Sequence, residues 1–271
     1  MKPFIFKIIA LIFFSIFTTQ LSAKKFHGKA YYFSKSKMEL GNWGARMSEA
    51  QKKQIQNRLK DRLEKKYILN FNMQESTFLE EDKIDAISGA TDSWGGYFSR
   101  GDLHKNIKEN KLVQSQEFYG KRFLVKDKLV NIEWSLGTET KKIGNYTCYK
   151  AAAMVPKSEL NWFDFSWSDL RQNSDETQKI EEPMIVIEAW YTPQIPVAQG
   201  PAEYWGLPGL ILEVSAGNTT LLCSEIILNP KEKVTITAPD KGENITKKGY
   251  TSNIRKKMVE MRNNRMGRRS R

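Results

Sequence analysis

Hydrophobic and polar residues alternate with a period of two in many short segments of this chain, which is the pattern of β-strands with one buried face. The segments that follow this pattern are residues 29–35, 68–73, 76–79, 112–119, 121–126, 129–136, 146–155, 184–192, 210–214, 221–228 and 234–237. Residues 184–192 are largely apolar on both alternating faces, which is typical of a strand buried on both sides. The pattern therefore predicts a protein built mainly of short strands.

One early stretch has a helical period instead. Its apolar residues recur every four positions, at Ile55, Leu59, Leu63 and Tyr67. Ser48 and Gln51 have the spacing of a capping box, in which each side chain satisfies a free backbone N–H at the start of a helix. These features predict a helix over residues 48–66 with one narrow apolar stripe that packs on a sheet.

This order of elements predicts an α+β fold dominated by antiparallel strands. We expect a strongly curved meander sheet with the early helix packed on its concave side, an arrangement similar to the periplasmic lipoprotein carriers at the level of fold. Residues 158–182 combine an aromatic cluster with a polar stretch, which predicts an insertion loop. Residues 24–246 then form a single β-rich domain.

The segment from Gly200 to Val214 predicts a sharp corner that leads into a core strand. Pro208 presets φ for the first central position of a turn, and Gly209 tolerates the positive φ that the second position of a type II turn requires. Leu210 to Val214 then alternate as a strand. We expect this corner to be architectural.

Several blocks in this order resemble the GLPGLI family of exported proteins, found largely in Bacteroidetes. The blocks are Trp134-Ser135-Leu136, Glu139 to Gly144, Tyr146 to Ala151, Ala189 to Thr192, Gly200-Pro201 and Gly206-Leu207-Pro208-Gly209-Leu210-Ile211. The resemblance extends over nearly the whole mature chain. It implies an exported protein and supplies no catalytic residues.

The N-terminus has the layout of a secretory signal peptide. Lys2 and Lys7 flank the start of an apolar run over residues 8–17, and polar or small residues lead to Ala23. The run is short for a membrane span. We expect residues 1–23 to be removed, and the absence of a cysteine near the cut predicts that the protein is not a lipoprotein. The mature chain is then soluble in the periplasm or otherwise exported.

The formal charge of +12 is concentrated in residues 247–271, a basic C-terminal tail with ten Lys or Arg residues and one acidic residue, Glu260. Tyr250, Ile254, Met258 and Met261 have the spacing of a short amphipathic helix. For an exported protein this charge does not indicate nucleic acid. A solvated extension and a peripheral contact with anionic surfaces both remain open.

Cys148 and Cys223 are the only two cysteines. In an oxidising compartment they predict a disulfide, and the alternative is a pair of buried thiols.

Catalytic and metal-binding patterns are scarce. His27 and His104 lack the spacing of a metal site, and neither a nucleophile elbow nor a phosphate-binding glycine loop is present. We therefore expect no metal and no cofactor, and the sequence favours a binding protein over an enzyme.

Aromatic residues remain as candidate ligand contacts. They flank the corner at Trp190, Tyr191, Tyr204 and Trp205 and occupy the insertion at Trp162 and Phe165. Such side chains can line an apolar or peptide-binding groove, or they can fill the core. The leading hypothesis is an exported envelope accessory protein that binds an apolar or peptide-like ligand or an outer-membrane partner. The alternative is an envelope hydrolase whose catalytic set assembles only in three dimensions.

Overall fold

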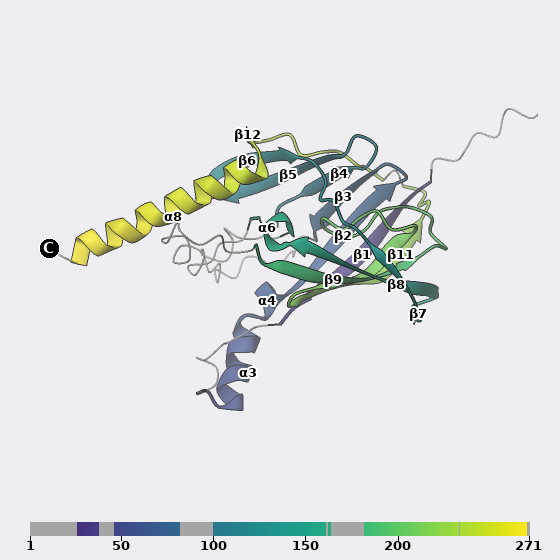
Figure 1. Ribbon diagram of the computed structural model, residues 1–271, viewed down its shortest axis with the longest axis horizontal. Coiled ribbons are helices and arrows are strands. Elements are labelled where there is room, and N and C mark those ends of the chain that lie inside the picture. Colours follow the sequence, from purple (N-terminus) through teal and green to yellow (C-terminus); the bar gives the residue numbers. More distant parts are fainter. Residues whose placement is uncertain are drawn as a thin grey trace, which may run out of the picture.

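The computed structural model describes residues 26–37, 46–81, 100–160, 162–163, 182–232 and 234–269. The predicted signal peptide, Phe165 and most of the predicted insertion lie outside these residues. Within them the protein is mostly β, with one large sheet and few helices (Figure 1).

The sheet has twelve strands in the order β12-β6-β5-β4-β3-β2-β1-β11-β10-β9-β8-β7. Their bounds are β1 His27–Ser36, β2 Glu64–Asn72, β3 Glu75–Glu80, β4 Leu103–Asn106, β5 Lys111–Phe118, β6 Lys121–Asp127, β7 Ser135–Ile143, β8 Tyr146–Pro156, β9 Met184–Thr192, β10 Leu210–Ala216, β11 Thr219–Leu228 and β12 Glu243–Ile245.

Two antiparallel meanders, β1–β6 and β7–β11, make up most of the sheet. The pairing of β1 with β11 joins them, with Tyr32 opposite Cys223. The short β12 pairs with β6 in parallel and makes the sheet mixed. The prediction of a mainly antiparallel fold is confirmed at this level.

A short connector shows that the sheet is not flat. Residues 128–134 join β6 to β7, which are ten strand positions apart in the sheet. Ten spacings of a flat sheet measure roughly 48 Å, whereas a connector of this length reaches at most about 28 Å. In Figure 1 the half of the sheet with β4, β5 and β6 lies above the half with β8, β9 and β11. Leu129 and Val130 of the connector are buried in the main core.

The predicted stretch 48–66 is helical only in part: it forms two helices, α3 Glu49–Arg58 and α4 Lys60–Leu63, and β2 begins at Glu64. The predicted capping box between Ser48 and Gln51 is present. The predicted packing is wrong, because none of the ten residues of α3 is buried. Ile55 and Leu59 are the large apolar residues in a run of charged and amide side chains, too few to offset the desolvation of that surface.

The predicted disulfide is also wrong, since Cys148 and Cys223 are free thiols. They lie on β8 and β11, and β9 and β10 run between these strands. A disulfide needs Cα atoms roughly 4.4 to 6.8 Å apart, which neighbouring strands provide. Burial raises the pKa of Cys148 to about 11 and that of Cys223 to about 12, so both thiols stay protonated at neutral pH.

The basic segment is a long helix, α8 Lys247–Arg269, whose first turns belong to the packed body. Tyr250, Ile254 and Met258 are 0, 2 and 0% exposed and form a second core. Their partners come from β5, β6 and the residues after α6 Lys157–Leu160, namely Phe118, Phe123, Val125, Trp162 and Phe163. The boundary that the sequence suggested at residue 246 is therefore not a boundary of packing.

Among the described residues, no helix is both long enough and apolar enough to cross a membrane.

Truncating Ile254 should reveal the second core. We expect Ile254→Ala to lower the free energy of unfolding by about 2 to 4 kcal/mol, because it leaves a cavity among aromatic side chains. The neighbouring Asn253 is exposed, and Asn253→Ala should stay within about 0.5 kcal/mol of the parent. Urea unfolding measures both. Equal, small losses would show that α8 is not docked.

Candidate functional site

The segment that contains the GLPGLI motif, residues 195–211, lies inside the body and is here called the corner segment. Its two ends bond to each other: the Leu210 N–H donates to the Ile195 carbonyl (2.9 Å), and the Ile211 N–H donates to the Gln199 carbonyl (3.1 Å). The Tyr32 hydroxyl of β1 donates to the Ile211 carbonyl. The segment is thus bonded both to itself and to the centre of the sheet.

The predicted turn geometry at Pro208 and Gly209 is wrong. The Gly209 N–H donates to the Leu207 carbonyl (2.8 Å), which closes a three-residue γ-turn centred on Pro208. Positive φ occurs at Gly206 (94°) and not at Gly209. Gly209 is required for space, because a Cβ there would lie 2.2 Å from the Thr192 carbonyl oxygen.

A buried lysine from β4 anchors the middle of the corner segment. Lys105 is 0% exposed, and its ammonium donates to the carbonyls of Gly200 (2.7 Å) and Tyr204 (2.8 Å). Gly200 leaves no room for a side chain, because a Cβ would lie 2.7 Å from Ile211 Cδ1. Burial lowers the pKa of Lys105 to about 7; the carboxylate of Glu203 raises it and Arg100 lowers it further.

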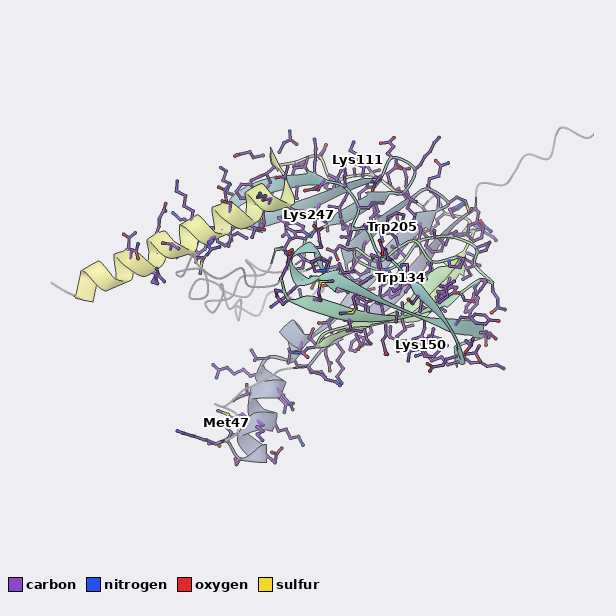
Figure 2. The ribbon with its side chains drawn as sticks, viewed as in Figure 1. Met47, Lys111, Trp134, Lys150, Trp205 and Lys247 are labelled. Carbon is purple, nitrogen blue, oxygen red and sulfur yellow. The ribbon has the colours of Figure 1, made fainter. Side chains whose placement is uncertain are left out.

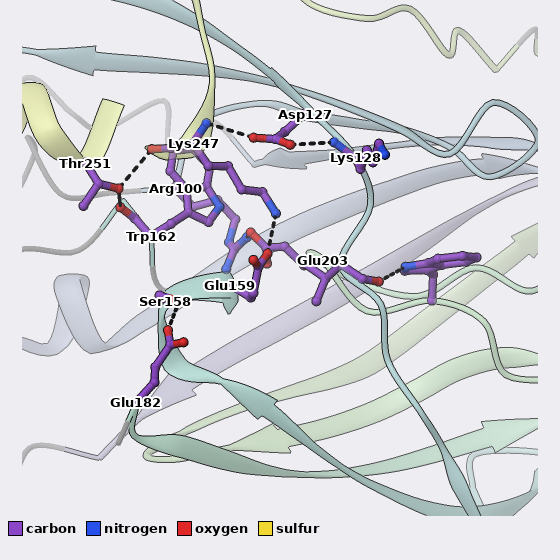
Figure 3. Close-up of polar contacts among 12 residues, drawn as sticks. Arg100, Asp127, Lys128, Ser158, Glu159, Trp162, Glu182, Glu203, Lys247 and Thr251 are labelled. Atoms are coloured by element: carbon purple, nitrogen blue, oxygen red, sulfur yellow. Dashed lines mark hydrogen bonds and ion pairs between the residues drawn. The ribbon is translucent and has the colours of Figure 1, made fainter. Parts of the chain in front are cut away.

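A buried ion pair lies beside this lysine. The Arg100 guanidinium donates to Glu203, whose side chain is 1% exposed (Figure 3). The guanidinium carbon also lies 4.9 Å from the ring centre of Phe163, so Arg100 connects the corner segment to the second core. Burial alone would lower the pKa of Arg100, but the Glu203 carboxylate raises it above its ordinary value.

Uncharged polar residues complete this group on the same face of the sheet. Ser76 pairs with Lys105 across β3 and β4, and its hydroxyl donates to Gln199 Oε1 (2.8 Å). Gln114 of β5 lies two residues from the partner of Lys105. We call Ser76, Arg100, Lys105, Gln114, Gln116, Gln199 and Glu203 the buried polar cluster.

Three amides of this cluster have unmet hydrogen-bonding capacity. Among the described residues, neither the nitrogen nor the oxygen of the Gln114 side chain has a partner, and the same holds for the nitrogens of Gln116 and Gln199. All three side chains are buried. A buried amide without partners costs roughly 1 to 3 kcal/mol of stability, so the cluster is costly unless another group binds there.

The predicted ligand-contacting aromatics do not gather in one groove. Tyr204 and Trp205 belong to the corner segment, where the Trp205 indole N–H donates to the Val130 carbonyl (2.9 Å) and the Trp205 carbonyl accepts from Trp134 Nε1 (2.9 Å). Figure 2 shows Trp134 and Trp205 in the middle of the body. Of the predicted aromatics in the corner segment, Tyr204 contacts the buried polar cluster, because its backbone carbonyl accepts from Lys105.

The other aromatics lie elsewhere. Tyr191 is buried in the main core, and Trp162 is buried in the second core. Trp190 is half-buried on β9, where the ammonium of Lys141 lies 4.3 Å from its ring centre. Phe165 lies outside the described residues.

One surface cavity has a volume of about 440 Å³. It is lined by Asp102, Ser115, Glu117, Arg122, Pro239, Asp240 and Lys241. Ser115 and Glu117 alternate with the glutamines of the polar cluster along β5, so the cavity lies on the opposite face of the sheet. Its charged lining differs from the predicted apolar groove.

No group of three His, Cys, Asp or Glu side chains that could hold a metal ion occurs among the described residues. The cations and amides of the buried polar cluster are better suited to bind a polar organic group.

Most residues of this cluster are not among the candidate site residues that the sequence predicts. Gln114 and Gln116 share one face of β5 with Leu112 and Phe118, so amides occupy positions where the core face requires apolar residues. That pattern was visible. The position of Lys105 had no such signal, because its partners are backbone carbonyls almost one hundred residues away.

Comparisons with known proteins find a family model that matches part of the chain and solved structures with low sequence identity. A family model described as a protein of unknown function, Porph_ging, matches residues 134–213. These residues include the corner segment and Glu203, whereas Lys105 and Gln114 precede them. No curated protein matches the chain.

Two solved structures of PNGF-II, in space groups C2 and P21, are similar to this chain. The identities are 16 and 15%, the TM-scores are 0.48 and 0.44, and the matches cover 84 and 82% of this chain. This chain spans about a third, 32%, of the length of each PNGF-II chain.

Replacing each of two glycines of the motif with alanine should distinguish a steric requirement for glycine from a requirement for positive φ. Gly209→Ala should cost several kcal/mol, because its Cβ would overlap the Thr192 backbone. Gly206→Ala should cost roughly 1 to 2 kcal/mol for its positive φ alone. Gly120 has φ 74° and nothing within 4 Å, so Gly120→Ala is the control for a pure conformational cost. Urea unfolding measures the loss of stability in each variant. If Gly209→Ala loses no more than the other two variants, the close approach of the Thr192 backbone to Gly209 is contradicted.

The depressed pKa of Lys105 predicts a pH-dependent stability. Between the folded pKa of about 7 and the ordinary value of 10.5, the unfolded chain binds the extra proton. The free energy of unfolding therefore rises with pH, by up to about 1.4 kcal/mol per unit. Relative to wild type, Lys105→Met should lose this slope between pH 7 and 8.5, a window below the titration of the buried thiols and phenols.

Chemical unfolding at several pH values measures the slope. Lys111 is exposed, and Lys111→Met should keep the wild-type slope. The same slope in wild type and Lys105→Met would mean that the buried lysine keeps its ordinary pKa.

Proposed function

We propose that this chain is an exported accessory protein of the cell envelope, of the GLPGLI kind, that binds a peptide-like ligand at the buried polar cluster. The compartment follows from the signal-peptide pattern of residues 1–23 and from the motif blocks of the sequence. The sequence leaves three alternatives open: an apolar ligand, a peptide-like ligand and an envelope partner. The polar side chains of the buried polar cluster support the peptide-like ligand.

The observation that carries this proposal is the unpartnered amide of Gln114. This side chain is 0% exposed, and both its donor and its acceptor lack a partner among the described residues. A peptide group offers one N–H and one C=O and can satisfy both atoms at once. The free nitrogens of Gln116 and Gln199 add donors for further carbonyl groups.

The corner segment gives this site a rigid wall. Lys105 fixes the carbonyls of Gly200 and Tyr204, and Ser76 orients the Gln199 amide through Oε1. Side chains held in this way lose little further freedom when a ligand binds, which favours affinity.

The proposal includes a strongly curved sheet, similar to that of the periplasmic lipoprotein carriers. Supporting it are the short connector between β6 and β7 and the burial of Leu129 and Val130 beneath the corner segment. In such a fold the ligand lies between the two halves of the sheet, next to the corner segment.

One observation favours a hydrolase as the second candidate. Ser76 and Lys105 are directly opposite on β3 and β4, and a lysine with a lowered pKa can act as a base for a serine. However, the Ser76 hydroxyl donates to Gln199 and the Lys105 ammonium donates to two carbonyls. Neither group bonds to the other, whereas the Gln114 amide has no partner among the described residues, so binding remains the leading proposal.

Replacing Gln114 should remove ligand binding and raise the stability of the protein. Gln114→Leu removes a buried amide without partners, so it should raise the free energy of unfolding by about 1 to 2 kcal/mol. Native mass spectrometry of the protein purified from its own envelope should show a bound peptide-like mass on wild type and none on Gln114→Leu. Gln54 on α3 is exposed, and Gln54→Leu should change neither property.

A destabilised Gln114→Leu together with a wild-type protein that carries no ligand would contradict the proposal, since the amide would then be structural. Covalent labelling of wild type, but not of Ser76→Ala, by a fluorophosphonate would favour the hydrolase instead.

A further inference from the structure

A row of exposed cations runs along α8, beside the residues that pack on the second core. Lys248, Arg255 and Arg262 follow one another at seven-residue intervals, and all three are exposed. Seven residues are close to two helical turns, so these side chains form one stripe with steps of roughly 10 Å along the axis. The sequence continues the interval at Arg269.

The docking of α8 fixes which side of the helix faces outward. The second core takes up Tyr250, Ile254 and Met258, and Thr251 Oγ1 donates to the Trp162 carbonyl (2.9 Å). Lys247 is also tied down, because its backbone N–H donates to Asp127 and its ammonium to Glu159 (Figure 3). The apolar side of this amphipathic helix is therefore occupied by its own protein.

The stripe has no acidic residues to neutralise it within the described part of the chain. Lys247 pairs with Glu159, and Lys257 pairs with Glu260 at 3.7 Å. No ion pair occurs at Lys248, Arg255 or Arg262 among the described residues. Figure 1 shows α8 pointing away from the sheet, so the body does not screen its distal turns.

We propose that the stripe of Lys248, Arg255 and Arg262 binds the phosphate groups of anionic lipids at a membrane surface, without insertion of the helix. An extended row of separate cations suits a surface that presents many phosphates. Because the apolar side is already packed, binding is electrostatic, and it differs from that of an amphipathic helix that buries its apolar face in lipid. This inference is independent of the proposed ligand site.

Vesicle sedimentation tests this surface on the full mature chain. Wild type should bind vesicles of phosphatidylcholine and phosphatidylglycerol much more tightly than vesicles of phosphatidylcholine alone, at low salt. Replacing Lys248, Arg255 and Arg262 with Gln should weaken that binding on the order of 100-fold, since each basic residue near an anionic surface contributes about a factor of five. The binding should also disappear at 0.5 M salt.

A matched variant controls for net charge. Lys108, Lys111 and Lys128 are exposed on the body, and replacing them with Gln removes the same charge. This variant should keep nearly all of the wild-type binding, and circular dichroism checks that both variants are folded.

Equal losses in the two variants would overturn the proposal, because net charge and not the stripe would then be responsible. Binding that survives 0.5 M salt would also overturn it and indicate an inserted apolar face. Retention of a DNA duplex together with no binding to anionic vesicles would identify a nucleic-acid surface instead.

Discussion

The buried ammonium of Lys105 is the contact on which the inside of this protein depends. It bonds to the carbonyls of Gly200 and Tyr204, two groups that the turn between them leaves without partners in the sheet. A buried carbonyl without a donor is costly. A neutral aliphatic residue at position 105 would leave two such carbonyls, so the lysine allows an irregular loop to lie in the interior.

The same loop also carries polar side chains whose burial is unfavourable unless they have partners. Glu203 enters the interior only because Arg100 neutralises it, and Gln199 only because Ser76 supplies one partner. Within the described part of the chain, both polar atoms of the Gln114 side chain and the amide nitrogen of Gln116 have no such partner. A chain selected for stability alone would place leucine there, so unpaired amides beside a fixed loop are more reasonably explained by binding.

The helix α8 both packs on the body and presents exposed cations. One side contributes three buried residues to the second core and thereby sets the orientation of the helix. Exposed positions beside these residues carry the cationic stripe. Because packing holds the helix to the body, the charge is presented in a fixed direction, which a solvated tail of the same composition would not achieve.

The sequence by itself determined the local structure, because periodicity and capping depend on near neighbours. The alternation of two predicted most strands, and Ser48 with Gln51 placed the start of α3 correctly. The prediction from sequence was wrong where one local pattern is compatible with two different tertiary structures. Residues 129–136 alternate like a strand, yet the first six belong to the connector between β6 and β7. Pro208-Gly209 has the composition of a type II turn, yet Gly209 is needed because Thr192 approaches it.

Only the tertiary structure decided which polar residues meet. Lys105, Gln114, Gln199 and Glu203 come from distant parts of the chain, and the pairing of β1 with β11 brings those parts into one sheet. The separation of the two cysteines by β9 and β10 is likewise a consequence of strand order, which no local pattern encodes. Sequence periodicity indicates which face of a strand is buried. Strand order decides which other residues that face contacts, and the candidate site depends on those contacts.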